Sequence, residues 1–365
     1  MLSPKKILFI SEVTKKSQIY WAAGNRRQEA DTCLLPPASC LLKLSHFSFT
    51  MHVSSGWCPE SECPESLNTF LSSAPVGNYP WDDTDKPPVV RWADFAPMVA
   101  ERAAYRDRQR QAGICDWPWI VAQRFGVAWA DPNQGSLGTC AGFAADTASW
   151  CMLLQHLADG IELEFVPTNP YPAWILGRED ARYRGGGASL SMVLNGINRY
   201  GRFPVAKVGT YAESIRSRTD WRKRTSDAEP FQAGCCYLGH LSTRDMVAAI
   251  LLCVRAGHPV AFGNSVAVSN TPVYLNGVKT GTLRGGWSHA TAFVAYREIG
   301  GRPYLALMNS WGKVYGTGKT ESDPASVIWM SEENVRRMCE GRYRDAFTIT
   351  YVESTPGVVN WRLVS

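Results

Sequence analysis

The sequence of 365 residues lacks any apolar run of the length that a membrane-spanning helix requires, about 20 residues. Its first apolar patch, Ile7–Ile10, is also too short for the hydrophobic core of a secretory signal peptide. We therefore expect no membrane partner and no secretion through the usual signal. The location of the protein stays open, with the cytoplasm slightly favoured.

The sequence also lacks a strong excess of charge of one sign. Lysines and arginines number 38 against 33 aspartates and glutamates, which gives a formal net charge of +5. The positive residues are spread along the chain, so no nucleic-acid partner is expected. The one basic cluster, Arg216–Arg224, is more typical of a solvated loop than of a binding patch.

A regular cysteine pattern is missing as well. The chain has eleven cysteines, an odd number at irregular spacings, and it is long enough to fold without disulfides. The cysteines and histidines near the N-terminus do not have the spacing of a zinc ribbon or finger, so we expect no metal and no cofactor. These residues are Cys33, Cys40, His46, His52, Cys58 and Cys63. Scattered free thiols, several of them buried, are the better interpretation.

Composition divides the chain into four parts. Residues 1–90 form an irregular N-terminal extension, in which 1–50 are interpreted either as disordered or as the product of an upstream start codon. A charged linking helix over 91–115 leads to the main domain, 116–356, which is followed by a short tail, 357–365. Within the main domain we expect a helical lobe over about 133–240 and a β lobe over about 241–352.

The apolar pattern changes from helical to extended along the main domain. Helices are predicted over 138–156, over 189–200 with Gly201 as a stop, and from Ser242 to Gly257. The vicinal pair Cys235-Cys236 is assigned to a turn-like segment. Strands are predicted over 259–268, 273–280 with a turn at Asn276-Gly277, 289–297, 304–309, 327–330 and 346–352. This order predicts an α+β fold, with a mainly helical lobe and a lobe built from an antiparallel sheet or barrel.

One cysteine has a setting typical of a nucleophile. In Asn133-Gln-Gly-Ser-Leu-Gly-Thr-Cys140, a glycine-rich turn delivers Cys140 to the first turn of a helix. Unpaired backbone N–H groups and the positive end of the helix dipole favour a thiolate there and can also hold an oxyanion. Gln134, upstream in the same loop, is a candidate second oxyanion donor. By itself, however, a cysteine at a helix start is more often simply buried.

A candidate base for this cysteine lies in the β-rich half. His289 is placed at the start of a predicted strand, and Asn309 at the end of the next one. Adjacent antiparallel strands can bring the two together, so that the Asn309 amide fixes the imidazole tautomer. Trp311 would then cover their hydrogen bond and keep water away from it. Each signal is weak alone, but in this combination and order they indicate a Cys–His–Asn site.

These blocks resemble the three signature blocks of the papain family of cysteine peptidases. The matching residues are Gln134 and Cys140, His289-Ala290, and Asn309-Ser-Trp-Gly-Lys-Val-Tyr-Gly316, within a resemblance that covers about 116–352. The resemblance implies a papain-like two-lobe fold, with the active-site cleft between the helical lobe and the β lobe. It also implies that Gly185 and Gly186 pair with the backbone of a bound substrate.

The chain departs from the family pattern at several positions. Leu137 and Tyr183 stand where the family has two cysteines joined by a disulfide, which indicates that the bridge was lost as a unit. Ala141 replaces the tryptophan after the nucleophile, and Tyr315 replaces the second tryptophan of the Asn-Ser-Trp-Gly block. No convincing match to the inhibitory pro-segment of the family is found upstream. The chain is therefore interpreted as a divergent member.

The resemblance implies a cysteine endopeptidase that hydrolyses peptide bonds through a thioester on Cys140, with His289 as general base and acid. The expected partner is a polypeptide substrate, and the expected state is a monomer. Two alternatives stay open: a catalytically inactive papain-like module that binds peptides or a partner protein, and an acyl-transfer enzyme with the same thioester chemistry. The role of residues 1–115 and the side-chain preference of the enzyme have no signal in the sequence.

Overall fold

The computed structural model describes residues 89–161, 163, 165–228, 233–316 and 323–352. All of them belong to the unit His52–Ser365, and only this unit is described here. The helices are α3 (Trp92–Gln111), α4 (Pro118–Arg124), α5 (Cys140–Ala158), α6 (Pro170–Asp180), α7 (Leu190–Tyr200), α8 (Val205–Val208), α9 (Tyr211–Ser214), the 3-10 helix η3 (Trp221–Asp227), α10 (Thr243–Arg255) and α11 (Glu332–Cys339). The strands are β1 (Val89–Val90), β2 (Thr168–Asn169), β3 (Phe203–Pro204), β4 (Ala233–Tyr237), β5 (Val260–Val268), β6 (Val273–Leu275), β7 (Val278–Thr280), β8 (Leu283–Ile299), β9 (Arg302–Met308), β10 (Val327–Ser331) and β11 (Arg344–Val352). The predicted α+β class is confirmed.

Nine of these strands form one sheet, in the order β1-β4-β11-β5-β8-β9-β10-β7-β6. Neighbours are antiparallel except for the pairs β1–β4 and β10–β7, which are parallel. The expected antiparallel sheet is therefore present. Strand β4 lies within the range expected for the helical lobe, but it belongs to this sheet. Cys235 and Cys236 are accordingly buried strand residues, and their assignment to a turn is wrong because β4 pairs with both β1 and β11.

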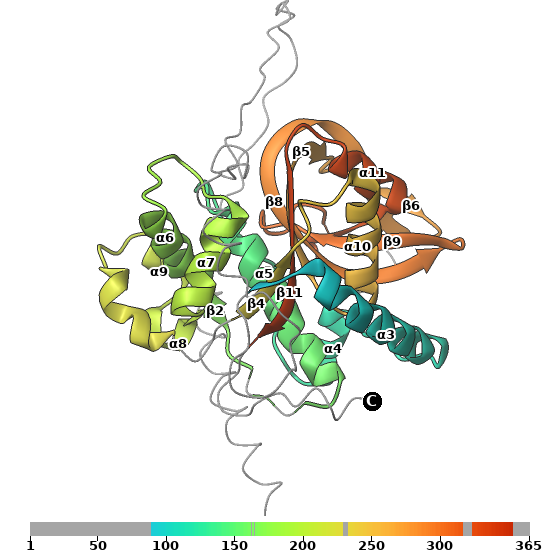
Figure 1. Cartoon of the computed structure of the whole chain (residues 1–365), viewed down its shortest axis with the longest axis horizontal. Helices are drawn as coiled ribbons and strands as arrows, with labels where there is room; N and C mark the ends of the chain where they lie inside the picture. The colour runs from blue at the N-terminus through green and yellow to red at the C-terminus, as the bar shows by residue number, and fades with distance from the viewer. Residues whose placement is uncertain (1–88, 162, 164, 229–232, 317–322, 353–365) are drawn as a thin grey trace, which may run out of the picture. The chain divides into compact units, whose positions relative to one another are not determined.

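Helix α5 lies between the sheet and helices α6 and α7 (Figure 1). Nearly all of its side chains are buried, as expected of a helix that is apolar on every side. One core cluster joins Met152 of α5 and Trp174 of α6 to sheet residues such as Ala292 and Trp329. Because α5 packs against both halves of the fold, it fixes the N-terminal residue of the helix, Cys140, at their junction.

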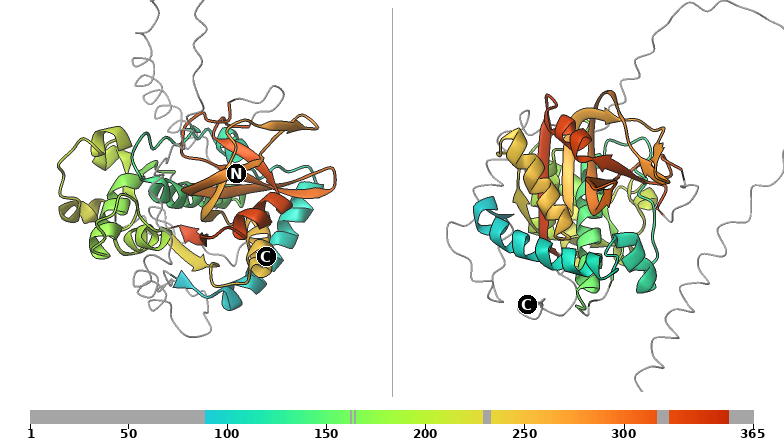
Figure 2. Two further views of the ribbon diagram at one scale, coloured as in Figure 1. Left: turned by 90° about the horizontal axis from the view of Figure 1, so that it is seen from above. Right: turned by 90° about the vertical axis from the view of Figure 1, so that its right-hand side faces the viewer.

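Helix α3 packs along α10 (Figure 2). The apolar side chains Phe95 and Val99 belong to the same buried cluster as residues of α10. Arg106 of α3 is buried and Arg102 is half-buried, and both pair with Asp159, the C-cap residue of α5. Breaking a buried ion pair leaves an uncompensated charge and costs about 3–5 kcal/mol. Helix α3 is therefore an integral part of the folded unit.

Several local sequence signals are confirmed. Gly201, with φ of 86°, ends α7, and Gly257, with φ of 81°, follows the end of α10. Ser242 accepts a hydrogen bond from a backbone N–H at the start of α10. Asn276 and Gly277 have φ of 50° and 81°, which suits the two-residue turn between β6 and β7.

The seven cysteines within the described ranges are all free, and six of them are buried. In the same ranges, no group of three or more side chains is arranged to hold a metal ion, and no helix is long and apolar enough to cross a membrane. The cysteines and histidines from Cys33 to Cys63 lie outside the described residues. In the basic stretch, Arg222 pairs with Asp180 and Glu179 of α6 at the protein surface, as expected of a solvated segment.

Candidate active site

Cys140 is the first residue of α5 and is fully buried. The preceding residue, Thr139, is the N-cap, but its side chain does not accept a hydrogen bond from the helix. The Thr139 hydroxyl instead lies 2.8 Å from the Tyr211 hydroxyl. The first N–H groups of α5 are therefore not capped by Thr139, and they remain directed at the Cys140 end of the helix.

The thiol of Cys140 touches the strand that carries His289. The backbone N–H groups of Ala290, the next residue of β8, of Ala141 and of Cys140 itself act to lower the pKa of this thiol. Burial outweighs them and raises the pKa of Cys140 to about 12. The resting thiol is thus protonated at neutral pH. This differs from the thiolate expected at a helix N-terminus, because burial penalises the charged form of the thiol.

His289 lies inside β8, six residues after the strand begins at Leu283, and not at a strand start as predicted. Its Nε2 lies 2.8 Å from Oδ1 of Asn309, which directly follows β9. Its Nδ1 has no hydrogen-bond partner in the part of the chain that the structure describes. The β8–β9 ladder therefore brings His289 and Asn309 together. Asn309 occupies Nε2 of the imidazole, and Nδ1 has no hydrogen-bond partner among the described residues.

The orientation of Asn309 decides which nitrogen of His289 carries the proton. Oδ1 of Asn309 accepts the backbone N–H of Ser310 at 2.7 Å, while Nδ2 donates to the hydroxyl of Tyr315 at 3.2 Å. With Oδ1 fixed as an acceptor, Nε2 of His289 must be the N–H donor. Nδ1 is then unprotonated and has a free lone pair, so this nitrogen can act as a base.

Two indole rings enclose the imidazole. Trp311 stacks on His289 with ring centroids 4.4 Å apart, and Trp287 meets it edge-on at 4.8 Å. Trp311 therefore lies against one face of the imidazole; that it shields the hydrogen bond with Asn309 from water stays a prediction. Burial lowers the pKa of His289 to about 4, although the hydrogen bond with Asn309 acts in the opposite direction. The imidazole is accordingly neutral at pH 7.

Gln134 is joined to the Asn-Ser-Trp-Gly block. The backbone N–H of Gln134 donates to the Ser310 carbonyl at 2.8 Å, and the Ser310 hydroxyl donates to Oε1 of Gln134 at 2.6 Å. Nε2 of Gln134 donates to the Leu137 carbonyl at 2.7 Å, so the amide N–H₂ group faces the loop that ends at Cys140. One of its two hydrogens is used there, and the other is available to an oxyanion.

Tyr211, from α9, braces the same loop. Its hydroxyl donates to the Gln134 carbonyl at 2.9 Å and lies within hydrogen-bond distance of the Thr139 hydroxyl. Its ring packs edge-on against Phe143 of α5, with centroids 4.8 Å apart. Tyr211 thus connects the candidate oxyanion donor, Gln134, to the start of α5.

Gly185 and Gly186 lie in the segment between α6 and α7. Gly186 is exposed and has open space where a Cβ would stand, whereas Gly185 is packed against the hydroxyl of Tyr183. The Gly185 carbonyl accepts a hydrogen bond from Arg178 of α6. Leu137 and Tyr183 stand at the two positions where the resemblance implies a lost disulfide. Leu137 is 38% exposed.

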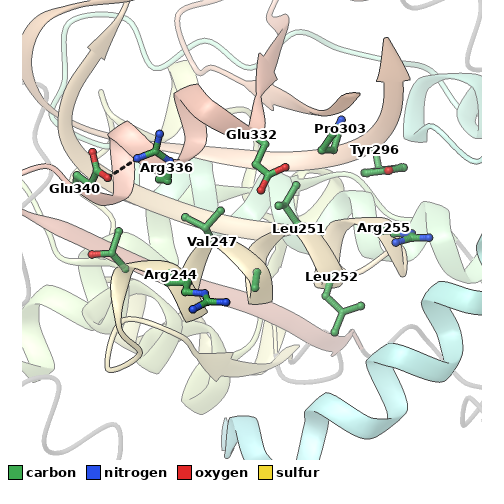
Figure 3. A pocket seen from close by; sticks show the side chains of 12 residues that line it. Arg244, Val247, Leu251, Leu252, Arg255, Tyr296, Pro303, Glu332, Arg336 and Glu340 are labelled. Atoms are coloured by element: carbon green, nitrogen blue, oxygen red, sulfur yellow. Dashed lines mark hydrogen bonds and ion pairs between the residues drawn. The ribbon is translucent and has the colours of Figure 1, made fainter. Parts of the chain in front are cut away.

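Two grooves of the folded unit lie away from Cys140. The first, of about 580 Å³, lies among α10, α11, β8 and β9 and is lined by Leu251, Tyr296 and Glu332 among others (Figure 3). The second, of about 530 Å³, adjoins the end of α3 and includes Trp117. Neither contains the candidate nucleophile. Cys140 and His289 themselves have no exposed surface.

Three residues at the site had not been identified from the sequence. Trp287 is two residues before His289 on the same strand, so the alternation of strand side chains is a signal that could have found it. Asn264 is the cross-strand neighbour of His289 and accepts a hydrogen bond from Trp287 at 3.0 Å. Tyr211 carries no local signal, because its contacts reach residues far away in the sequence.

No protein-family model matches this chain, and no curated protein matches it. Solved structures of cysteine proteases are similar to it. Xylellain of Xylella fastidiosa is 17% identical, with a TM-score of 0.43 over 62% of this chain and 84% of that one. Digestive procathepsin L 3 of Tenebrio molitor is 16% identical, with a TM-score of 0.42 over 79% and 88%. The ragweed protease Amb a 11 is 21% identical, with a TM-score of 0.42 over 64% and 66%. A likeness at these values carries no argument about activity, which depends on the geometry of the site.

Proposed function

We propose that this chain is a cysteine peptidase in which Cys140 is the nucleophile, His289 the general base and acid, and Asn309 the residue that fixes the imidazole. The arrangement at His289 carries the proposal: Nε2 is held by Asn309, and Nδ1 keeps a free lone pair. The backbone N–H of Ala290, the next residue on the same strand, acts to lower the pKa of the thiol. A polypeptide is the proposed substrate.

In the proposed reaction, Nδ1 of His289 takes the thiol proton while Sγ of Cys140 attacks the carbonyl carbon of the scissile bond. The backbone N–H of Cys140 and the side-chain amide of Gln134 hold the oxyanion that forms. His289 then gives its proton to the leaving amine, and the C–N bond breaks to leave a thioester. Water, deprotonated by the same nitrogen, attacks the thioester carbonyl, and the thiol leaves with the returned proton.

The resting pair is neutral in this proposal. Burial raises the pKa of Cys140 to about 12 and lowers the pKa of His289 to about 4, so neither group is charged at pH 7. Proton transfer then accompanies the attack on the carbonyl and does not precede it. The free lone pair on Nδ1 suits this role, because it must accept a proton from a neutral thiol.

Labelling with a peptidyl epoxysuccinate tests the proposal. We expect modification of Cys140, loss of labelling in His289→Ala, and no peptide hydrolysis by Cys140→Ser. The matched control is Cys115→Ser, which removes a half-buried free thiol outside the site and should leave labelling and hydrolysis unchanged. Labelling of other thiols while Cys140 stays inert would overturn the peptidase.

One observation favours a second function. Because Cys140 and His289 expose no surface, the chain also suits an inactive module that binds a peptide without cleaving it. Such a module would bind peptides equally well as wild type and as Cys140→Ser, and the wild type would form no thioester. The acyl-transfer alternative keeps the thioester and is separated from hydrolysis by adding a competing amine and measuring the transfer product.

A further inference from the structure

Arg178 occupies an unusual position beside the glycine segment. It is a half-buried residue of α6 whose guanidinium donates a hydrogen bond to the Gly185 carbonyl. The guanidinium also lies over two aromatic rings, 4.2 Å from the centroid of Trp174 and 5.9 Å from that of Tyr183. A planar guanidinium is able to stack and to donate at the same time, which a lysine ammonium cannot do.

The other side of Gly185 is held by Tyr183. A Cβ at this position would lie 2.2 Å from the Tyr183 hydroxyl, so no residue with a side chain fits without displacing the ring. Gly185 is therefore fixed twice, through its carbonyl by Arg178 and through its Cα by Tyr183. The next residue, Gly186, has nothing within 4 Å of its Cβ position and is exposed to an incoming ligand.

Arg178 is attached to a rigid part of the helical half. At Gly142 of α5, a Cβ would stand 3.2 Å from Cβ of Trp174, so α5 and α6 are in close contact there. Helix α6 approaches α7 still more closely, because a Cβ at Gly177 would lie 2.0 Å from the Met192 carbonyl oxygen. The position of Arg178 is therefore coupled through α6 to the helix that begins at Cys140.

The charge of Arg178 has no acidic partner. Among the described residues it forms no ion pair, and its Nε has no hydrogen-bond acceptor. Burial lowers the pKa of Arg178, while Tyr183 and Tyr171 act in the opposite direction. Half-burying a cation without a carboxylate is unfavourable, and stacking on Trp174 offsets only part of it. The Arg178 guanidinium therefore contributes little to stability, and we look for a functional reason for its hydrogen bond to Gly185.

We propose that Arg178 is a positioning residue, which holds the Gly185-Gly186 backbone ready to pair with the main chain of an extended peptide substrate. This rests on the proposed peptidase function. In the family that the chain resembles, a disulfide lies at the positions of Leu137 and Tyr183, and here a cation stacked on aromatic rings ties down the same segment. The segment is therefore ordered without any covalent bond and independently of thiol oxidation.

Kinetics of Arg178→Ala test this role, with Arg199→Ala as the matched control. Arg199 lies in the same half, pairs with Asp180 and stacks on Tyr200, but it does not contact the glycine segment. We expect KM for a peptide substrate to rise about tenfold in Arg178→Ala with kcat nearly unchanged, the size of one lost charge-assisted hydrogen bond. Arg178→Lys should recover less than half of this effect, because it cannot stack and donate together.

Two substrate-independent readouts separate this proposal from the peptidase itself. Amide hydrogen exchange should accelerate at residues 183–187 in Arg178→Ala and stay unchanged in Arg199→Ala. Alkylation of Cys140 by iodoacetamide should be unaffected, while inactivation by a peptidyl epoxide slows about tenfold. Equal exchange and equal KM in Arg178→Ala and Arg199→Ala would overturn the positioning role. If Cys140 of the wild type reacts with neither iodoacetamide nor the peptidyl epoxide, the proposed peptidase function is rejected. The proposed role of Arg178 in substrate binding is then rejected too, whatever the hydrogen-exchange rates are.

Discussion

The two sides of the candidate site are held in different ways. On the sheet side, His289 lies within β8 and Asn309 follows β9, so backbone hydrogen bonds of a long ladder set their separation. On the helical side, Gln134 and Gly185 lie in loops. One backbone bond to Ser310 and the hydroxyls of Ser310 and Tyr211 hold Gln134, and the Arg178 side chain holds Gly185. Many backbone hydrogen bonds of the sheet therefore hold His289 and Asn309 in place, whereas only a few hydrogen bonds hold Gln134 and Gly185.

This difference shows where single substitutions act. Changing one residue of the ladder leaves its backbone bonds intact, so a loss of activity on the sheet side reports on the chemistry of the side chain removed. Changing a bracing side chain on the helical side moves a loop, and the loss then reports on position. The two kinds of effect are separable by size and by their distribution between kcat and KM.

The largest effect is expected on the sheet side. His289→Ala removes the proposed base and should lower kcat/KM for a peptide substrate by about 10³–10⁴-fold, with thermal stability nearly retained because the ladder persists. Steady-state kinetics with circular dichroism measure both. His240→Ala, a histidine in the turn before α10, serves as the control and should keep wild-type kinetics.

The second largest effect is expected from removing Gln134, the proposed oxyanion donor. Gln134→Ala should lower kcat by about 10²-fold, with KM changed little, since the lost contact is made in the transition state. The control is Gln123→Ala at an exposed site of α4. A rise in KM with unchanged kcat would assign Gln134 to ground-state binding and remove it from the oxyanion site.

The pH dependence of Cys140 alkylation tests whether His289, on the sheet side, changes the ionisation of the Cys140 thiol at the start of α5. Burial raises the pKa of Cys140 to about 12, so below that pH the thiol is protonated and the thiolate fraction grows with pH. Between pH 7 and pH 9 the rate with iodoacetamide should rise about tenfold per pH unit. His289→Ala should show the same slope, because the neutral imidazole does not stabilise a thiolate. A rate that is flat over this range in the wild type, and sloped only in His289→Ala, would instead show a thiolate–imidazolium pair.

The smallest effect is expected from a brace on the helical side. Tyr211→Phe keeps the ring against Phe143 but removes the hydroxyl that bonds to the Gln134 carbonyl. We expect a loss of about 1 kcal/mol in unfolding free energy and a roughly fivefold lower kcat, because the loop loosens. Chemical denaturation and kinetics measure the two. Tyr274→Phe on the exposed strand β6 should change neither.

Prediction from sequence succeeded where a signal is local. The Asn276-Gly277 turn, the glycine that ends α7 and the capped start of α10 depend on residues close together in the chain, and all three were found. The strand around His289 was predicted too short, because its first part contains Gly285 and Gly286, which do not favour a strand, and pairing with β5 decides its conformation. Cys235-Cys236 was misassigned for a similar reason, since β4 is a strand only through its neighbours β1 and β11.

The sequence by itself determined which residues have the chemistry of the site: a cysteine at a helix start, a histidine and asparagine in neighbouring strands, and a glutamine upstream. Only the tertiary structure decided how they are held. It orients the Asn309 amide through Ser310 and Tyr315, and it brings Tyr211 to the loop of Gln134 and Arg178 to Gly185. It also encloses Cys140 and so reverses the expectation of a resting thiolate. Burial and long-range hydrogen bonds depend on the packing of distant segments, and no local pattern encodes them.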